Sequence, residues 1–246
     1  MLKFKRIIAA SAIAFTAVMP VQAKLVLDTF NYPAPGVELE VSNGVTQDTD
    51  QESAVFGADV FYTLDYQSGP ASSAVDTAVS SLLFNDGYLA YSEDSGVDAV
   101  LTIDYFIDAD NSGDYDQLTS DNTGALNLAA AGDYFYFDIV SADAGFSVTL
   151  TLTDFFGIIA STVVSIPEVV NLDNINFPVN YTQLVSLNLF AGLDLGKISR
   201  VTAVIDSDSG STDFTLSEVG VVPEPSALAI LGLGLIGLGL RRRKLV

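Results

Sequence analysis

The sequence contains no cysteine and no histidine among its 246 residues. Without cysteine it can form no disulfide bond, so the stability of the fold must come from its core. Without histidine it cannot build the Ser-His-Asp or Cys-His arrangements of nucleophilic catalysis. Most zinc and copper sites are excluded as well, because they depend on imidazole and thiolate ligands.

Positive charge is almost confined to the two ends of the chain. Only Lys24, Lys197 and Arg200 lie between residues 24 and 222, whereas 30 of the 31 acidic residues lie there, which gives this region a net charge of about −27. Such a surface repels nucleic acid, whose binding rests on Lys and Arg contacts with phosphate. It favours solubility and the binding of divalent cations. We therefore expect no nucleic-acid partner.

The first 23 residues have the three-part form of a secretory signal peptide. MLKFKR supplies three cations, IIAASAIAFTAVM supplies an apolar run of 13 residues, and Val21-Gln22-Ala23 supplies small residues at a cleavage site. The apolar run is too short to span a membrane. We predict cleavage after Ala23 by signal peptidase, and a retained N-terminal anchor is the alternative.

The last 24 residues combine three features in order. Pro223-Glu224-Pro225 is followed by an uncharged apolar segment, 226–240, and by a basic tail, 241–246. As a helix, the uncharged residues 225–240 would span about 24 Å, against roughly 30 Å of bilayer hydrocarbon, so we expect a short transmembrane helix. Under the positive-inside rule, the basic residues stay in the cytoplasm, where they act as a membrane stop signal. These residues are Arg241, Arg242, Arg243 and Lys244.

This order of features resembles the PEP-CTERM sorting signal of Gram-negative bacteria. The resemblance implies that an exosortase, a membrane protease, recognises Pro223, Glu224 and Pro225 and cleaves near them. It implies a protein held transiently at the inner membrane and then released or kept at the cell surface, often in species that make an exopolysaccharide matrix. The same segment also carries the label of an ice-binding protein C-terminal domain, which describes the tail only. An ordinary C-terminal anchor is the alternative.

The region between these signals, residues 24–222, reads as one all-β domain. Apolar and polar residues alternate with period 2, which marks strands with one buried and one wet face, and clusters of Asp, Gly, Ser and Asn separate them. Only 71–84 could form a short helix, and 31–58 is expected to be an irregular lead-in. We predict about nine strands, near 25–30, 59–66, 99–108, 133–140, 146–154, 158–165, 184–190, 199–206 and 214–216.

An antiparallel β-sandwich is the natural way for these strands to bury one face each. The pattern is similar to the jelly-roll domains of PEP-CTERM proteins and of carbohydrate-binding modules, and this resemblance is one of pattern only. We therefore expect a jelly-roll-like sandwich between the signal peptide, 1–23, and the sorting signal, 223–246.

A candidate calcium loop lies at residues 108–116. Its spacing matches the first nine positions of an EF-hand-type loop, with Gly113 at the turn position. Thr119 replaces the bidentate glutamate at position 12 and a strand precedes the loop, so the alternatives are a calcium-binding β-turn and an acidic hairpin turn. Residues 206–210 form a shorter version. The candidate Ca²⁺ ligands are Asp108, Asp110, Ser112, Asp114 and Asp116.

Tyrosines are the candidates for carbohydrate binding, because an aromatic ring can stack on the apolar face of a sugar. Tyr134 and Tyr136 fall on the strand face opposite Phe135 and Phe137. If the phenylalanines belong to the core, the two tyrosines are exposed or line a cleft. Ordinary strand tyrosines are the alternative. Further candidates are Tyr62, Tyr66, Tyr88, Tyr91 and Tyr105.

Two further patterns indicate little by themselves. Thr149, Thr151 and Thr153 share one strand face, as on ice-binding β proteins, but one such row is common in any sandwich. Among 30 acidic residues no pair is marked out for cleavage of a glycosidic bond. We expect no enzyme but a structural protein of the surface or biofilm matrix, with calcium as a candidate stabiliser. A module that binds exopolysaccharide is the main alternative, and a glycan-acting enzyme is a distant one.

Overall fold

The computed structural model describes residues 24–30, 37–42, 46–52, 59–69, 74–80, 87–93, 95–106, 125–169, 181–206 and 212–223. The expected signal peptide, the apolar segment 226–240 with its basic tail and the candidate calcium loop lie outside these residues. Within them, no helix is long and apolar enough to cross a membrane.

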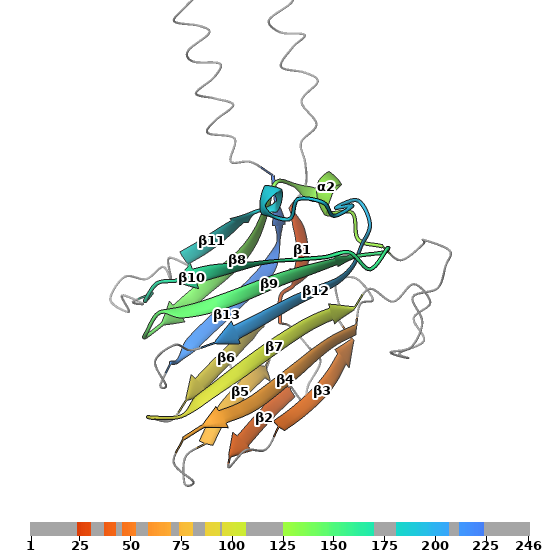
Figure 1. Cartoon of the computed structure of the whole chain (residues 1–246). Coiled ribbons are helices and arrows are strands. Elements are labelled where there is room, and N and C mark those ends of the chain that lie inside the picture. The colour runs from red at the N-terminus through yellow and green to blue at the C-terminus, as the bar shows by residue number, and fades with distance from the viewer. Residues whose placement is uncertain are drawn as a thin grey trace, which may run out of the picture.

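The described residues form an antiparallel β-sandwich of two sheets, as the sequence predicts (Figure 1). Sheet A has the order β11 (Tyr181–Ser186), β8 (Tyr134–Ala142), β13 (Phe214–Val222), β6 (Tyr88–Glu93), β5 (Ala74–Ser80) and β2 (Val37–Ser42), and β1 (Leu25–Asp28) also pairs with β13. Sheet B has the order β10 (Ile159–Ile166), β9 (Phe146–Asp154), β12 (Ile198–Asp206), β7 (Asp98–Phe106), β4 (Asp59–Ser68) and β3 (Thr46–Glu52). One short helix, α2 (Leu128–Ala131), and a 3₁₀ turn, η1 (Leu187–Leu189), lie at one end.

Alternation along each strand builds the core between the sheets. In β9, every second side chain from Phe146 to Leu152 is buried, while the serine and threonines between them face outward. β12 repeats the pattern opposite β7 and β9 in long antiparallel registers. Each fully buried Leu, Ile or Phe contributes about 1.5–3 kcal/mol through removal of apolar surface from water. A core of this size can stabilise a sandwich that has no disulfide bond.

All nine predicted strands are present, and β2, β3, β5 and β6 come in addition. The helix expected within 71–84 is wrong, because β5 pairs with both β2 and β6 in unbroken registers. The irregular lead-in expected for 31–58 is also wrong, since β2 and β3 lie there. β3, with the sequence TQDTDQE, has no apolar alternation to reveal it and pairs with β4 as the edge strand of sheet B.

A buried polar network links the first strand to the opposite sheet. The carboxylate of Asp28, 2% exposed, accepts hydrogen bonds from the hydroxyls of Tyr62 on β4 (3.1 Å) and Tyr105 on β7 (3.3 Å). It also accepts the backbone N–H of Phe30 at 2.6 Å. Phe30 is fully buried and has a φ of 52°, a left-handed conformation that is rare for a bulky residue. The network thus ties β1, in sheet A, to two strands of sheet B.

The two ends of the domain meet along one strand pair. β1 runs antiparallel to the last part of β13, with Leu25 opposite Val221 and Val26 opposite Gly220 (Figure 1). Gly220 allows the close approach, because a Cβ there would lie less than 3.0 Å from the backbone oxygen of Leu25. The chain therefore enters and leaves the sandwich at neighbouring positions.

Asp154 closes the hairpin between β9 and β10. Its carboxylate accepts the backbone N–H groups of Phe156 and Ile158, both at 2.9 Å, and that of Asp194 at 3.2 Å. Burial by itself would raise the pKa of Asp154, but these three N–H donors favour the charged form and bring its pKa below the ordinary value. The hairpin and the loop around Asp194 are therefore held by one charged side chain.

This lowered pKa makes part of the stability depend on pH. A carboxylate with a depressed folded pKa stabilises the fold above its unfolded pKa of about 3.9, and the contribution is lost as the pH falls through the lower folded value. We expect Asp154→Asn to be less stable than wild type at pH 7, with a gap that closes as the pH falls below about 4. Urea unfolding of both proteins from pH 7 to pH 2.5 checks this; a gap that stays constant over that range would contradict it.

Candidate functional site

The outer face of sheet B carries a transverse row of aligned polar and aromatic side chains. Thr151 on β9 lies opposite Thr202 on β12, and Thr202 lies opposite Asp104 on β7. Asp104 in turn lies opposite Phe61 on β4. Their sequence neighbours point into the core, because successive side chains of a strand alternate between faces. The row therefore belongs to the solvent side of the sheet.

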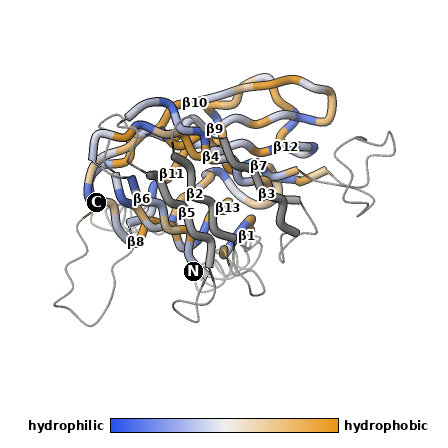
Figure 2. The backbone as a smooth tube through the Cα atoms, turned by 90° about the horizontal axis from the view of Figure 1, so that it is seen from below, coloured by the Kyte–Doolittle hydropathy of each residue, from blue (hydrophilic) through white to orange (hydrophobic). Residues whose placement is uncertain are grey.

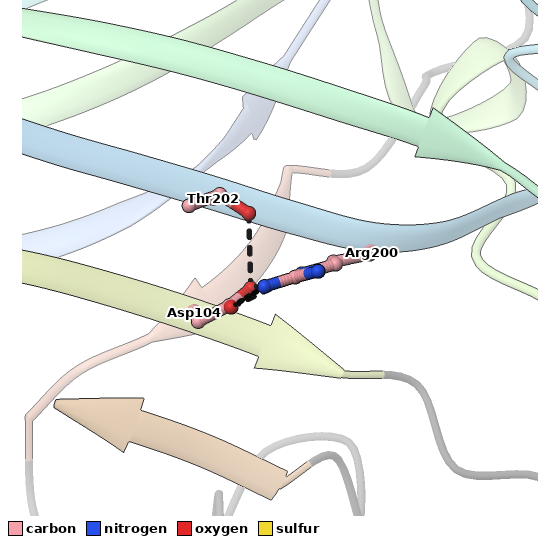
Figure 3. A network of polar contacts seen from close by, with 3 residues as sticks. All are labelled: Asp104, Arg200 and Thr202. Carbon is pink, nitrogen blue, oxygen red and sulfur yellow. Dashed lines mark hydrogen bonds and ion pairs between the residues drawn. The ribbon is translucent and has the colours of Figure 1, made fainter. Parts of the chain in front are cut away.

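Arg200 and Asp104 form an ion pair on the two central strands of this face, β12 and β7 (Figure 3). The Nε of Arg200 donates to both carboxylate oxygens of Asp104, at 2.8 and 3.0 Å, and its Nη2 donates to Oδ2. Thr202 donates its hydroxyl to Oδ1 at 3.0 Å. The Asp104 side chain is only 9% exposed, whereas that of Arg200 is 40% exposed. The buried carboxylate thus fixes a guanidinium that remains open to solvent.

Two phenylalanine rings complete the site. The guanidinium carbon of Arg200 lies 4.4 Å from the centroid of the Phe106 ring, and the rings of Phe106 and Phe61 meet edge to face at 5.6 Å. Both phenylalanines are half-buried, so part of each ring reaches solvent. We call Phe61, Asp104, Phe106, Arg200 and Thr202 the Arg200 cluster.

The chemistry of the Arg200 cluster suits recognition better than catalysis. A guanidinium offers donors in a fixed plane, and a ring beside it offers a flat apolar surface. Asp104 already accepts from Arg200 and Thr202, so it is held as a structural anion. Sequence reasoning did not identify this cluster. Arg200 could have been noticed as one of three cations in residues 24–222, but its partners depend on strand register.

The tyrosines proposed for sugar binding lie elsewhere. Tyr134 and Tyr136 do fall on the outer face of sheet A, opposite the fully buried Phe135 and Phe137. Of the two expected positions, exposed or lining a cleft, the first is wrong for Tyr136, since it is only 1% exposed. Its register partner is Gly220, and Lys24 lies over its ring, 4.6 Å from the centroid. Tyr134 is half-buried, and its role in sugar binding stays a prediction.

The hydroxyl of Tyr136 is committed as well. It donates to Glu218, which also forms an ion pair with Lys24. Burial, followed by the hydrogen bond and the charge of Glu218, raises the pKa of Tyr136 far above its ordinary value, so the phenol stays neutral. Tyr136 therefore acts as a cover over Gly220 and a tie to the first residues of the domain.

The other candidate tyrosines are divided between the core and the surface layer. Tyr62, Tyr91 and Tyr105 are buried, with at most 3% of each exposed, which contradicts a role as an exposed stacking platform. Tyr91 stacks on Phe214, with ring centroids 4.8 Å apart, and donates its hydroxyl to Glu93. Burial raises the pKa of Tyr91, and the hydrogen bond to Glu93 raises it further. Tyr66 and Tyr88 are half-buried.

The acidic residues show no assembled metal site in the part of the chain that the structure describes. No group of three or more acidic side chains there is placed to hold a metal ion. The candidate calcium ligands from Asp108 to Asp116 lie outside the described residues, beginning two residues after Phe106. Of the shorter acidic stretch 206–210, only Asp206 is described, at the end of β12. Calcium binding therefore stays a prediction.

The sorting motif begins directly at the edge of the sandwich. Val222 is the last residue of β13, and its carbonyl accepts the N–H of Asp133 at 3.0 Å. Gly132 approaches so closely that an added Cβ would lie less than 3.0 Å from the backbone of Val222 and Pro223. Pro223 follows at once, whereas Glu224 and Pro225 lie outside the described residues. No spacer therefore separates the last strand from the first motif residue.

Solved structures with a similar chain path include carbohydrate-binding modules and a longer enzyme. A family 11 carbohydrate-binding module from Clostridium thermocellum, in complex with a mixed-linked β-1,3-1,4 tetrasaccharide, is 10% identical, covers 82% of this chain and 98% of its own, and has a TM-score of 0.33. A module of family 28, specific for non-crystalline cellulose, is 12% identical over 58% of this chain and 78% of its own, with a TM-score of 0.32. An exo-β-agarase is 14% identical with a TM-score of 0.39, and covers 66% of this chain.

These likenesses assign no role to any residue. The chain spans only 23% of the length of the agarase chain. No curated protein matches the sequence. Residues 221–244 match the PEP-CTERM protein-sorting motif, which confirms the motif expected from Pro223, Glu224, Pro225 and the basic tail. The chain therefore carries a PEP-CTERM sorting motif, a signal that indicates export and exosortase processing.

Proposed function

We propose that the exported sandwich is a non-catalytic module that binds extracellular polysaccharide through the Arg200 cluster, and so belongs to the exopolysaccharide-associated surface or matrix. The observation that carries this proposal is the placement of Arg200. One of only three cations in residues 24–222 lies on a solvent-facing sheet, held by a buried carboxylate and flanked by two phenyl rings.

The cluster combines the two kinds of contact that a sugar chain offers. The C–H face of a pyranose fits a half-exposed ring, and its hydroxyls can accept from a guanidinium that is already oriented. The guanidinium is preorganised, so little side-chain entropy is lost on binding. Thr153 and Thr151 on β9, which lie opposite Arg200 and Thr202, add donors and acceptors across the sheet. A linear chain lying across the sheet would meet all of these groups.

The surrounding charge favours a neutral glycan. Asp104 neutralises Arg200 locally, and the exported region as a whole is strongly acidic. An anionic polysaccharide would therefore be repelled, unless a divalent cation bridges the two surfaces. Neutral chains are therefore the first class to test, and calcium has a defined role only for acidic ones.

Binding is tested with the exported protein recovered from cells that express the full chain. We expect it to sediment with insoluble neutral β-glucan or agarose, in calcium and in chelator alike. Phe106→Ala and Arg200→Ala should each weaken binding about three- to tenfold, because a ring or a charged donor contributes about 0.5–1.5 kcal/mol. Sedimentation isotherms for each variant give the dissociation constants.

A matched control removes a phenylalanine elsewhere. Phe156 is 64% exposed on the hairpin after β9, where Lys197 lies over its ring, and it is outside the Arg200 cluster, so Phe156→Ala should bind as wild type does. Equal losses for Phe156→Ala and Phe106→Ala would contradict the proposed site. The absence of binding to every neutral glycan would overturn the proposed function, and binding to alginate only in calcium would replace neutral with acidic polysaccharide.

A further inference from the structure

Strand β10 is an edge strand of an unusual kind. It pairs with β9 over eight residues without a bulge, and it ends the strand order of sheet B. Edge strands in natural proteins are generally protected by charges, prolines, bulges or short length. Residues 155–166, FFGIIASTVVSI, contain no charge and no proline. Within residues 155–166, none of these protections is therefore present.

The other edges of the sandwich differ. At the far side, β2 contains two glutamates and β3 contains two aspartates and a glutamate. β11 is uncharged but has only six residues, and its Thr182 donates to the carboxylate of Asp138 on the neighbouring strand. β10 is the longest of the four edges and also lacks an adjacent carboxylate along its length, since β9 carries only Asp154 at its end.

The exposed side of β10 is apolar as well. Ile159 and Val163 are 64% and 65% exposed, and Phe156 and Ile158 in the preceding turn are 64% and 50% exposed. Figure 2 shows β10 at the margin of the molecule, with hydrophobic residues along it. Asp154 holds the turn that presents Phe156 and Ile158. The edge thus combines the outer backbone groups of a terminal strand with large β-branched side chains.

We propose that β10 pairs with β10 of a second copy of this chain, antiparallel and about a two-fold axis at Ser161. A strand edge is recognised by another strand, because its free N–H and C=O groups repeat at strand spacing. The net charge does not prevent this contact. Each copy carries about −27, and screening leaves only charges within about 8 Å effective at physiological salt, so two copies can approach where the edge itself is uncharged.

The register follows from which side chains share a face. Ile159, Ser161, Val163 and Ser165 alternate on the exposed face of β10. A two-fold at Ser161 places Ile159 of each copy opposite Val163 of the other, so both apolar pairs are buried together and serine faces serine at the axis. A closed two-fold contact of this kind uses the same patch on both copies and stops at the dimer. The two B sheets then form one continuous sheet.

Because the chain has no cysteine, a single substitution tests the contact. Residues directly opposite in an antiparallel pair lie at Cα distances of about 4.5–5.5 Å, within the range of a disulfide bond. We expect the exported Ser161→Cys protein to form a disulfide-linked homodimer in the oxidising periplasm, seen on a non-reducing gel and by intact mass. Ser92→Cys, exposed on β6, is the matched control and should stay monomeric.

A charge variant tests the same contact without a cross-link. Like charges directly opposite each other destabilise a strand pair, so Ser161→Glu should raise the dimer dissociation constant at least about tenfold in sedimentation equilibrium. Ser92→Glu adds the same charge away from β10 and should leave the constant unchanged. A wild-type protein that is monomeric at all concentrations would overturn the proposal. So would a Ser161→Cys protein that cross-links only to other proteins, or no more than Ser92→Cys does.

Discussion

Replacing Asp28 with alanine is expected to lower the free energy of unfolding by about 3 kcal/mol or more, because each buried polar group that loses its partner costs about 1–3 kcal/mol. The carboxylate of Asp28 accepts from Tyr62, Tyr105 and the backbone of Phe30. All three residues are at most 2% exposed, so water cannot easily replace the lost acceptor. Urea unfolding followed by tyrosine fluorescence measures the change.

The tyrosine variants distinguish the network from simple loss of packing. Tyr62→Phe and Tyr105→Phe keep the rings and remove one donor each, so each should cost less than Asp28→Ala. In the background of Asp28→Ala, either Phe substitution should cost less than it does in wild type, since the donor that it removes already lacks its acceptor. Strictly additive losses would show that the carboxylate and the hydroxyls act independently, contrary to this interpretation.

Gly220→Ala is expected to destabilise the sandwich by about 1–3 kcal/mol, in the range of other overpacked sites. The new Cβ would meet the backbone oxygen of Leu25 and the ring of Tyr136, both closer than 3.0 Å. The backbone of Leu25 cannot rotate away as a side chain can. The clash is therefore removed only if β1 moves away from β13 and the ring of Tyr136 moves away from position 220. Hydrogen exchange of the β1 amides should therefore rise more than exchange elsewhere in the sheet.

A second glycine provides the control for this effect. A Cβ at Gly196 would first meet a side-chain oxygen of Asp194, at 3.2 Å, which can rotate aside. Gly196→Ala should therefore change the melting temperature much less than Gly220→Ala. If both variants lose the same stability, backbone crowding against β1 is not the cause.

The sequence predicts the strands that bury one face in the core and expose the other. β7, β9 and β12 bury every second residue, so period-2 alternation identifies them directly. β3 and β5 escape this test for different reasons. β3 contains no apolar residue, and the alanine-rich sequence around β5 is compatible with a helix until β2 and β6 pair with it. Partner strands supply information that a local pattern lacks.

The candidate site was harder to predict than the fold for the same reason. The alternation of faces places Tyr136 correctly opposite Phe135 and Phe137. Its burial, however, depends on Lys24, which lies over its ring, and on Gly220, which has no side chain to displace it. Likewise, Arg200 meets Asp104 and Phe106 only because β12 and β7 pair in one particular register. The PEP-CTERM motif was predictable because all of its parts are contiguous in sequence.

The pairing of Leu25 with Val221 also affects the order in which the domain can fold. A chain that crosses a membrane from its N-terminus presents β1 first and β13 last, so β1 must wait for its partner until the rest of the domain has emerged. Contacts between distant parts of a chain form slowly, because the intervening loop must first be closed. Since Pro223 directly follows β13, the final strand and the sorting motif arrive together. Closure of the sandwich therefore requires the strand that directly precedes the sorting motif.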